Sequence, residues 1–418
     1  MWSKAAVIVA AVCIAAVLPL TACQGGYGGQ QADTQSQEAV QREAEAGDEI
    51  SEAPPPDPVS LVITCVGDVM VHKSQIASQY DSRTDTYDYS NNFAYAKKYI
   101  ESSDLAICNL ETTFGGKPYT GYPVFSAPDE LAAALKAAGF DIAVTSNNHV
   151  MDRGKAGLAR TIEVLRASGL SVTGSREDPG QARYALADVK GVKVAVVAYT
   201  YASSSPTGDL LVNGSAVSEG AADLINYFRY DHMDEDLKKI EGTVAEAREA
   251  GADVVVMYYH WGDEFHLKSN EAQRRIAEKT VNEVGADIIF ASHTHTPQEV
   301  GFITNNKTGL LVPVFYSMGN FISNQRVETL DAMNSKYTEI GVIASVALEY
   351  DIEGKKVTGM TAGAIPTWVD KYRSGGRDVY AVIPLDEDFE ANESLTVSGH
   401  LNRARKARED AYGILGID

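Results

Sequence analysis

The sequence has 418 residues, with 36 Lys or Arg against 57 Asp or Glu, so its formal net charge at pH 7 is -21. This charge repels phosphate backbones, which argues against nucleic acid as a partner, and any anionic substrate needs a locally positive site, for instance a metal. The length allows an α/β domain of about 250 residues with appendages.

The first residues have the pattern of an export signal. Lys4 precedes the apolar run "AAVIVAAVCIAAVL", and "LTAC" follows it, ending at Cys23. The run is shorter than the about 20 residues that a membrane-spanning helix needs. "LTAC" resembles a bacterial lipobox, which implies removal of residues 1–22 and lipidation of Cys23. The mature protein would then be tethered to the extracellular face of the cytoplasmic membrane; the alternative is a retained anchor helix.

Residues 23–58 are rich in Gly, Gln, Ala, Glu and Pro and end in "PPPDP". Such a composition buries too little apolar surface to fold. We therefore predict a disordered acidic linker that lifts the rest of the chain off the membrane.

The body of the chain alternates between two patterns. Short apolar, β-branched runs predict strands at residues 61–67, 105–110, 141–146, 192–200, 253–260 and 287–293. Helix-like stretches lie between them, at residues 128–139, 155–169, 234–252 and 270–286. Nearly continuous apolar strands that alternate with helices are typical of strands buried on both faces by crossover helices.

After "LVPVFYS" the pattern becomes richer in strands, as in "IGVIASVALEYDIEGKKVTGMTA", and a polar helix is expected from about Leu401. We therefore predict an α/β fold with a main domain over residues 59–330. Residues 331–418 would complete that domain with strands and the terminal helix.

The residues that follow the predicted strands share one kind of chemistry. They are Asp68, Glu111, Asn148, His149, His260, His293 and His295. Because sites in open α/β sheets form at the carboxyl ends of strands, these carboxylates, imidazoles and one amide are expected to converge on one rim.

This mixed ligand set suits Mn, Fe or Zn, and the missing thiolates argue against a structural zinc site. A carboxylate can bridge two ions about 3.5–4 Å apart, the arrangement that activates water for hydrolysis; Glu111 is our candidate bridge. If "HTH" is extended, His293 and His295 point to the same side and both reach the rim.

Each of these residues also has a simpler structural interpretation. A lone Asp or Asn at a strand end is commonly a helix cap or turn former, and Asp152 is expected to cap the helix that begins near Gly154. A lone His is commonly a satisfied polar residue. The coincidence favours a metal site, because His149, His260, His293 and His295, half of the eight histidines, stand at predicted strand ends.

These residues in this order resemble the CapA family, named for poly-γ-glutamate capsule synthesis, whose domain resembles the calcineurin-like metallophosphoesterases. The resemblance rests on "GDVMVH", "NLETTFGG", "TSNNHVMDRG", "YHWGDEF", "SHTHTPQ" and "YSMGNFISNQ", within roughly residues 61–325. It implies a metallophosphatase-like layered α/β sandwich that holds one or two divalent ions.

The resemblance also implies roles. Asn148 would be a metal ligand, and His149 the general acid toward the leaving group. The other ligands would be Asp68, Glu111, His260, His293 and His295. An acid must keep its proton available, which coordination through the same nitrogen would prevent.

Two departures from the phosphoesterase pattern stand out. Met70 occupies the place of the histidine in Asp-x-His, and Glu111 stands where that superfamily usually has Asp. Met70 cannot replace an imidazole, so one metal position is expected to be weak, absent or completed differently, with His72 as a possible substitute.

Residues beside the rim are candidates for substrate binding. Tyr122 in the "GKPYTGYPVF" loop, Trp261 and Asn320 are proposed to contact substrate, as is Tyr119. Packing is the alternative for the aromatics, and a structural turn is the alternative for Asn320. Cys65 and Cys108, in apolar runs, are expected to be buried thiols, with a disulfide between neighbouring strands as the alternative.

Two functions remain open. The residues imply a surface-anchored, metal-dependent hydrolase that acts on phosphoester or related bonds in an anionic envelope polymer. The family name implies a capsule assembly component that uses the same cleft to bind poly-γ-glutamate or another anionic polymer without cleaving it, alongside membrane proteins of capsule synthesis.

Overall fold

The computed structural model describes residues 7–8 and 57–417. The predicted signal peptide, the lipidation site Cys23 and the linker lie outside these residues, except for the short strand β1 (Val7–Ile8), which pairs with β19. The chain from Pro58 onward forms one compact unit.

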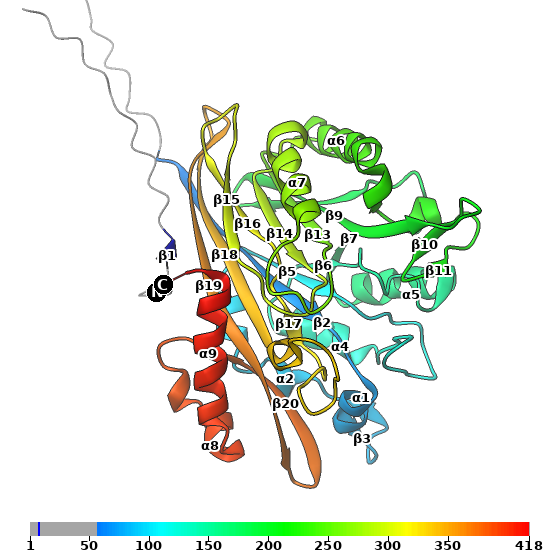
Figure 1. Cartoon of the computed structure of the whole chain (residues 1–418), viewed down its shortest axis with the longest axis vertical. Helices are drawn as coiled ribbons and strands as arrows, with labels where there is room; N and C mark the ends of the chain where they lie inside the picture. Colours follow the sequence, from blue (N-terminus) through cyan, green and yellow to red (C-terminus); the bar gives the residue numbers. More distant parts are fainter. Residues whose placement is uncertain (1–6, 9–56, 418) are drawn as a thin grey trace, which may run out of the picture. The chain divides into compact units, whose positions relative to one another are not determined.

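Two mixed sheets form the centre of this unit (Figure 1). The first has the order β1-β19-β18-β2-β5-β6-β7, with β17 paired to β2 and β20 to β19. Its strands from residue 59 onward are β2 (Val59–Val69), β5 (Leu105–Leu110), β6 (Ile142–Val144), β7 (Ser171–Thr173), β17 (Asn320–Ile322), β18 (Ile340–Asp351), β19 (Lys356–Ser374) and β20 (Arg377–Pro384). The strands β2, β5, β6 and β7 are parallel, and β18 joins β2 antiparallel.

The second sheet has the order β11-β10-β9-β13-β14-β16-β15, with β8 and β12 also paired to β9. Its strands are β8 (Tyr184–Val189), β9 (Val192–Ser204), β10 (Leu210–Val212), β11 (Ser215–Ala216), β12 (Tyr227–Arg229), β13 (Val254–His260), β14 (Ile288–Ser292), β15 (Val300–Thr304) and β16 (Leu311–Phe315). The run β9-β13-β14-β16 is parallel. A separate hairpin joins β3 (Tyr80–Asp81) and β4 (Thr86–Tyr87).

The helices are α1 (Lys73–Gln79), α2 (Ser90–Phe93), α3 (Lys97–Ile100), α4 (Glu130–Ala137), α5 (Gly154–Ala167), α6 (Met233–Glu249), α7 (Glu271–Lys279), α8 (Glu393–Ser398) and α9 (Leu401–Leu415). The helices α2 and α4 cover the outer face of the first sheet, and α6 and α7 cover the outer face of the second. The last two helices, α8 and α9, pack on the opposite face of the first sheet, beside the core between the sheets. Figure 1 shows α6 and α7 beside the second sheet. Leu237 and Ile240 of α6 and Ile276 of α7 pack there against Val255 and Met257.

The main core lies between the two sheets. There Ile63 and Ile107 of the first sheet share one apolar cluster with Val256, Tyr258 and other residues of the second. This confirms the predicted layered α/β sandwich, and it explains why the strands read as continuous apolar runs: each is covered on both faces.

The elements match the sequence pattern closely. All the predicted strands and helices form, although β6 is shorter than predicted and α7 continues as a π-helical turn, Thr280–Val284. The strand-rich end forms the antiparallel β18-β19-β20 arrangement, and the terminal helix begins at Leu401 as expected.

Cys65 and Cys108 are both buried and free. They lie on the neighbouring strands β2 and β5, but Cys65 belongs to the core between the sheets and Cys108 to the cluster on the opposite face. A disulfide cannot cross a sheet in this way, which confirms the expectation of two buried thiols.

A close backbone approach fixes the end of β2. Beside a register shift between Val66 and Asp68, the Asp68 N–H donates to Gly319 O at 2.8 Å. A Cβ atom added at Gly67 would lie 1.9 Å from Gly319 O. Gly67 therefore lets β17 approach β2 and sets the position of Asp68.

We expect Gly67→Ala to lower the free energy of unfolding by about 2 kcal/mol or more, because the added methyl group must displace the backbone. Gly359→Ala in β19 is the matched control, since a Cβ there meets nothing within 4 Å; it should change stability by less than about 0.5 kcal/mol. Urea unfolding of both variants measures the difference, and equal stabilities would contradict the role given to Gly67.

Candidate metal centre

The two sheets bring their polar strand ends to one place. Asp68 lies in β2 and Glu111 follows β5; from the second sheet, His260 ends β13 and His293 follows β14. All are buried, as are Asn148, His149 and His295. Such a concentration of buried titratable groups needs mutual or ionic partners.

One group of possible metal ligands consists of Asp68, Glu111 and His295, whose ligand atoms lie within 4.8 Å of one another. The Asp68 Oδ2 and His295 Nδ1 atoms are 3.0 Å apart, and Asn109 Nδ2 donates to Asp68 Oδ1 at 2.8 Å. Burial alone would raise the pKa of Asp68, but the hydrogen bond from His295 and its charge hold that pKa below the usual value. Burial alone would lower the pKa of His295, yet its contact with Asp68 raises it.

A second group consists of Glu111, His260 and His293. The His260 Nε2 atom is 3.2 Å from His293 Nδ1, 3.5 Å from Glu111 Oε1 and 3.0 Å from Asn148 Oδ1. Burial lowers the pKa of His260 to about 3 and that of His293 well below its usual value. Both rings are therefore neutral at pH 7, the state in which imidazole binds a metal.

Glu111 belongs to both groups, which is the placement that a bridging carboxylate needs. Both of its carboxylate oxygens are buried and accept no hydrogen bond from the described residues. Burial, together with the charge of Asp68, raises its pKa well above the usual value. A buried carboxylate without donors is costly, and a divalent cation would satisfy it, so the residues fit a metal site of oxygen and nitrogen ligands.

The "HTH" segment reaches the centre by another route than expected. An extended segment was the condition for both histidines to reach the rim, and the backbone is not extended, because His293 has φ 111° and His295 has φ 57°. Both side chains nevertheless enter the cluster. Such angles are rare for non-glycine residues and are found at functional sites.

His149 lies beside this cluster and does not belong to either group of ligands. Its Nδ1 is 2.8 Å from Asp152 Oδ2, and the Phe125 ring packs perpendicular to the imidazole with the ring centres 4.7 Å apart. Asp152 Oδ2 also accepts the Phe125 N–H at 2.6 Å. These contacts fix the ring and leave Nε2 as its free nitrogen.

The prediction that Asp152 caps the following helix is therefore wrong. Helix α5 begins at Gly154, and its N-cap residue, Arg153, makes no side-chain cap. The carboxylate of Asp152 is turned toward His149 instead, because the buried imidazole offers it a partner.

Sequence reasoning missed three residues. Asn109 binds Asp68, and Asn147 donates to Leu110 O at 2.8 Å while accepting the His149 N–H at 3.1 Å. The ring of Tyr201 lies 4.6 Å from that of His293. The amide in the apolar run "LAICNL" was a usable signal for Asn109; nothing in its local pattern marked Tyr201.

The predicted substrate contacts lie in different surroundings: Trp261 is in the core, Asn320 is beside the metal centre, and Tyr122 is exposed. Trp261 is fully buried, stacks on Tyr259 and donates its indole N–H to Tyr316 O at 2.9 Å, so it is part of the core. Asn320 is also fully buried: its Oδ1 lies 3.2 Å from His295 Nδ1, and its amide donates to Thr338 O. Tyr122 is 71% exposed on its loop, where a substrate contact stays a prediction.

Met70 and His72 account for the departure at the start of the motif. Met70 is buried, and His72 belongs to neither group of ligands. The His72 Nδ1 atom accepts the Asn324 N–H at 3.3 Å and lies 3.2 Å from Gln75 Oε1. His72 therefore does not substitute for the missing histidine.

A model of the family described as "Bacterial capsule synthesis protein PGA_cap" matches residues 62–325. The chain is 29% identical over 274 residues to the capsule biosynthesis protein CapA of Bacillus anthracis, covering 63% of this chain and 60% of that protein. It is 24% identical over 276 residues to the PGA biosynthesis protein CapA of Bacillus subtilis (strain 168), covering 63% and 64%. The chain thus spans less than two thirds of the length of these relatives.

Two solved structures are similar to this chain at low scores. A phosphatase from Mycoplasma pneumoniae has a TM-score of 0.41 at 13% identity, covering 81% of this chain and 99% of that one. The calcineurin-like phosphoesterase YfkN from Bacillus subtilis has a TM-score of 0.38 at 15% identity, covering 84% and 100%.

The buried carboxyl group of Glu111, which lacks a hydrogen-bond partner, leads to a prediction. Because its pKa is raised in the folded protein, the metal-free protein should lose stability as pH rises above the usual Glu range, where only the unfolded chain ionises freely. Glu111→Gln should remove this loss, so that the metal-free variant at pH 8 is more stable than the wild type by about 1–3 kcal/mol. Added Mn²⁺ should stabilise the wild type and not the variant.

Calorimetry with and without Mn²⁺ measures both effects, and elemental analysis measures the bound metal. Glu163→Gln, on an exposed position of α5, is the control and should behave as the wild type. A metal-free Glu111→Gln protein that is less stable than the wild type would contradict the interpretation that the Glu111 carboxyl group is unsatisfied without a metal.

Proposed function

Because this chain belongs to the PGA_cap family of bacterial capsule synthesis proteins, we propose that it is a metal-dependent hydrolase of the phosphoesterase type. Its substrate would be an anionic polymer of the cell envelope, of the poly-γ-glutamate kind. The bond cleaved would be a phosphoester or a related bond in that polymer.

The observation that carries the proposal is the buried carboxylate of Glu111, unpartnered and shared by two groups of ligand atoms. Asp68 and His295 would hold one ion, and His260, His293 and Asn148 a second. The donor set of carboxylate, imidazole and amide favours Mn, Fe or Zn. Because Met70 supplies no imidazole, the first ion would be the more weakly held of the two.

Ions bound there would activate water and neutralise negative charge on the scissile group. The protein itself would supply the proton. The Nδ1 atom of His149 faces Asp152, which holds the ring and leaves Nε2 to donate a proton to a leaving oxygen. Neither His260 nor His293 can take this role, since burial keeps both neutral.

The charge of the chain supports a metal-dependent mode of binding. With a formal net charge of -21, the protein repels a polyanion in general and would attract one only where the charge is locally reversed. The relative from Bacillus subtilis is a PGA biosynthesis protein by name, which supports a polycarboxylate as the polymer. Membrane proteins of capsule synthesis are the proposed partners.

We place the protein on the extracellular face of the cytoplasmic membrane, held by a lipid on Cys23. The support is the lipobox-like "LTAC" and the export-signal pattern before it. Among residues 7–8 and 57–417, no helix is long and apolar enough to cross a bilayer.

The alternative function is binding and transfer of the polymer without cleavage. Loss of one imidazole at Met70 favours it, because a cleft with one firmly held ion can bind an anion without aligning water for attack. The two functions share every ligand and differ in turnover alone.

The test of the proposed function measures metal and turnover together. Full-length protein should contain Mn, Fe or Zn and hydrolyse phosphodiesters or phosphomonoesters, and chelation should abolish the activity. Stoichiometric metal without turnover on any phosphoester would overturn the hydrolase and leave the binding function. Absence of bound metal in the wild type would overturn both.

His149→Ala should lower kcat about 10²–10⁴-fold on phosphodiesters with alkyl leaving groups and much less on p-nitrophenyl esters, which leave without a proton. Its metal content should equal that of the wild type, and His232→Ala, at a partly exposed histidine, should change neither quantity. An equal decrease in kcat on both kinds of ester, or a loss of bound metal, would contradict the role of His149 as general acid.

Cys23→Ser should release the protein from the membrane. In a fractionation of bacterial cells, the wild type is expected with the membranes after a salt wash, because a lipid anchor resists it, and the variant in a soluble fraction. A variant that stays with the membranes would favour the retained anchor helix.

A further inference from the structure

A groove of about 760 Å³ lies beside α1 and the loop over residues 115–125. We call it the tyrosine groove. Its walls include Lys73, Ile76, Tyr80, Tyr87, Lys117 and Tyr119. It contains none of the residues assigned to the metal centre.

The three tyrosines form one continuous aromatic wall. The ring centres of Tyr80 and Tyr87 are 5.2 Å apart, and those of Tyr87 and Tyr119 are 5.4 Å apart in an edge-to-face arrangement. All three side chains are half-buried. Their exposed faces offer apolar surface to the methylene groups of a ligand.

The groove also carries free hydrogen-bond donors. Lys73 and Lys117 are exposed, and neither ammonium group pairs with a carboxylate of the described residues; Lys117 Nζ lies 5.9 Å from the centre of the Tyr119 ring. The one carboxylate in its lining, Asp85, accepts the Tyr80 hydroxyl at 3.0 Å. Outside the lining, Glu130 Oε1 accepts the Tyr87 N–H at 3.3 Å. The lining itself carries two ammonium groups against one carboxylate, a local excess of positive charge in a chain of net charge -21.

The tyrosine groove is connected to His149 through its own loop. Phe125, at the end of that loop, packs against His149 and, with ring centres 5.3 Å apart, against His72, which directly precedes Lys73. Arg153 donates to Pro118 O at 3.3 Å and ties the other side of the loop to the His149 turn. The loop that forms one wall of the groove is therefore held against the His149 turn.

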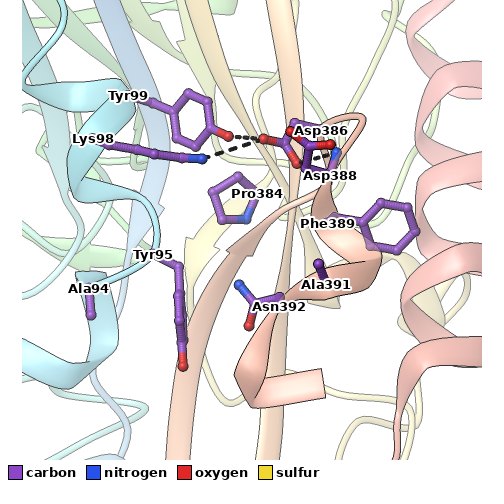
Figure 2. A pocket seen from close by; sticks show the side chains of 10 residues that line it. All are labelled: Ala94, Tyr95, Lys98, Tyr99, Pro384, Asp386, Asp388, Phe389, Ala391 and Asn392. Atoms are coloured by element: carbon purple, nitrogen blue, oxygen red, sulfur yellow. Dashed lines mark hydrogen bonds and ion pairs between the residues drawn. The ribbon is translucent and has the colours of Figure 1, made fainter. Parts of the chain in front are cut away.

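Two other pockets differ from the tyrosine groove because their cationic side chains are paired with carboxylates. In the pocket drawn in Figure 2, of about 300 Å³, Tyr99 and Lys98 both turn to Asp386, so its cation is already paired. In a pocket of about 270 Å³, Lys371 and Arg403 are bound by Asp378 and Glu328. The tyrosine groove alone among these three keeps its ammonium groups free.

We propose that the tyrosine groove binds a stretch of polycarboxylate chain outside the metal centre and independently of the metal; this inference rests on the proposed function, in which the substrate is an anionic polymer. Lysine ammonium groups pair with single carboxylates as point charges, whereas phosphate is matched best by the bidentate guanidinium of arginine. The groove has lysines and no arginine in its lining. The aromatic wall receives the methylene groups between the charges.

The test uses full-length protein and end-labelled poly-γ-glutamate, with affinity measured by fluorescence anisotropy with Mn²⁺ and after chelation. The wild type should bind in both conditions. Lys73→Gln combined with Lys117→Gln should weaken binding about fivefold to tenfold at low salt, and less at high salt, because the lost contacts are ionic. Lys98→Gln is the matched control, a lysine that also lies over a tyrosine ring but is paired, and should bind as the wild type.

Turnover of a small phosphodiester separates this inference from the proposed function. The double variant should retain it, since neither lysine lies in the metal centre. Polymer binding that is unchanged in the double variant, or that is lost whenever metal is removed, would overturn the groove and leave the hydrolase intact. Stronger binding of polyglycerol phosphate or of neutral dextran than of poly-γ-glutamate would overturn the choice of polymer.

Discussion

The structure depends on one buried carboxyl group without a hydrogen-bond partner. Both oxygens of Glu111 are buried, and no described residue donates to them. The groups around it offer lone pairs to a cation. They are the neutral imidazoles of His260 and His293 and, on the other side, Asp68 and His295, which contact each other. Burying these polar groups without a cation is unfavourable, and binding a cation among them would be favourable. The two sheets must therefore stay in a fixed relation, because each contributes half of the ligands.

Much of the fold followed from the sequence because its strands are buried on both faces. Runs such as residues 253–260 carry an unambiguous apolar signal, and the polar residue after each run marks the strand end. The convergence of Asp68, Glu111 and the histidines also followed, since parallel strands end at one edge of a sheet. The sequence did not show in which direction each side chain points. Trp261 directly follows His260 along the chain, yet its side chain stacks on Tyr259 in the core, and only the packing of the folded chain decides this.

The departures from the expected local structure at the "SNNHVMDRG" turn and at "HTH" have a common cause. Sequence rules assign Asp152 to a helix cap and treat the histidines as extended, because these are the local preferences. In the folded protein, tertiary contacts replace both: Asp152 binds His149, and His293 adopts an unfavourable backbone angle. Local preference fails where a residue is needed by a distant partner, and these are the positions that form the site.

The two cysteines lie on opposite faces of one sheet, each sealed in a different apolar cluster. Burial raises the pKa of the Cys108 thiol to about 12 and that of Cys65 well above its usual value, so neither is a thiolate in the native state. The described part of the protein thus reaches the same covalent form in a reducing or an oxidising compartment, and its folding requires no disulfide catalyst. Both thiols become reactive only when a sheet opens, which makes them internal probes of unfolding that need no engineered label.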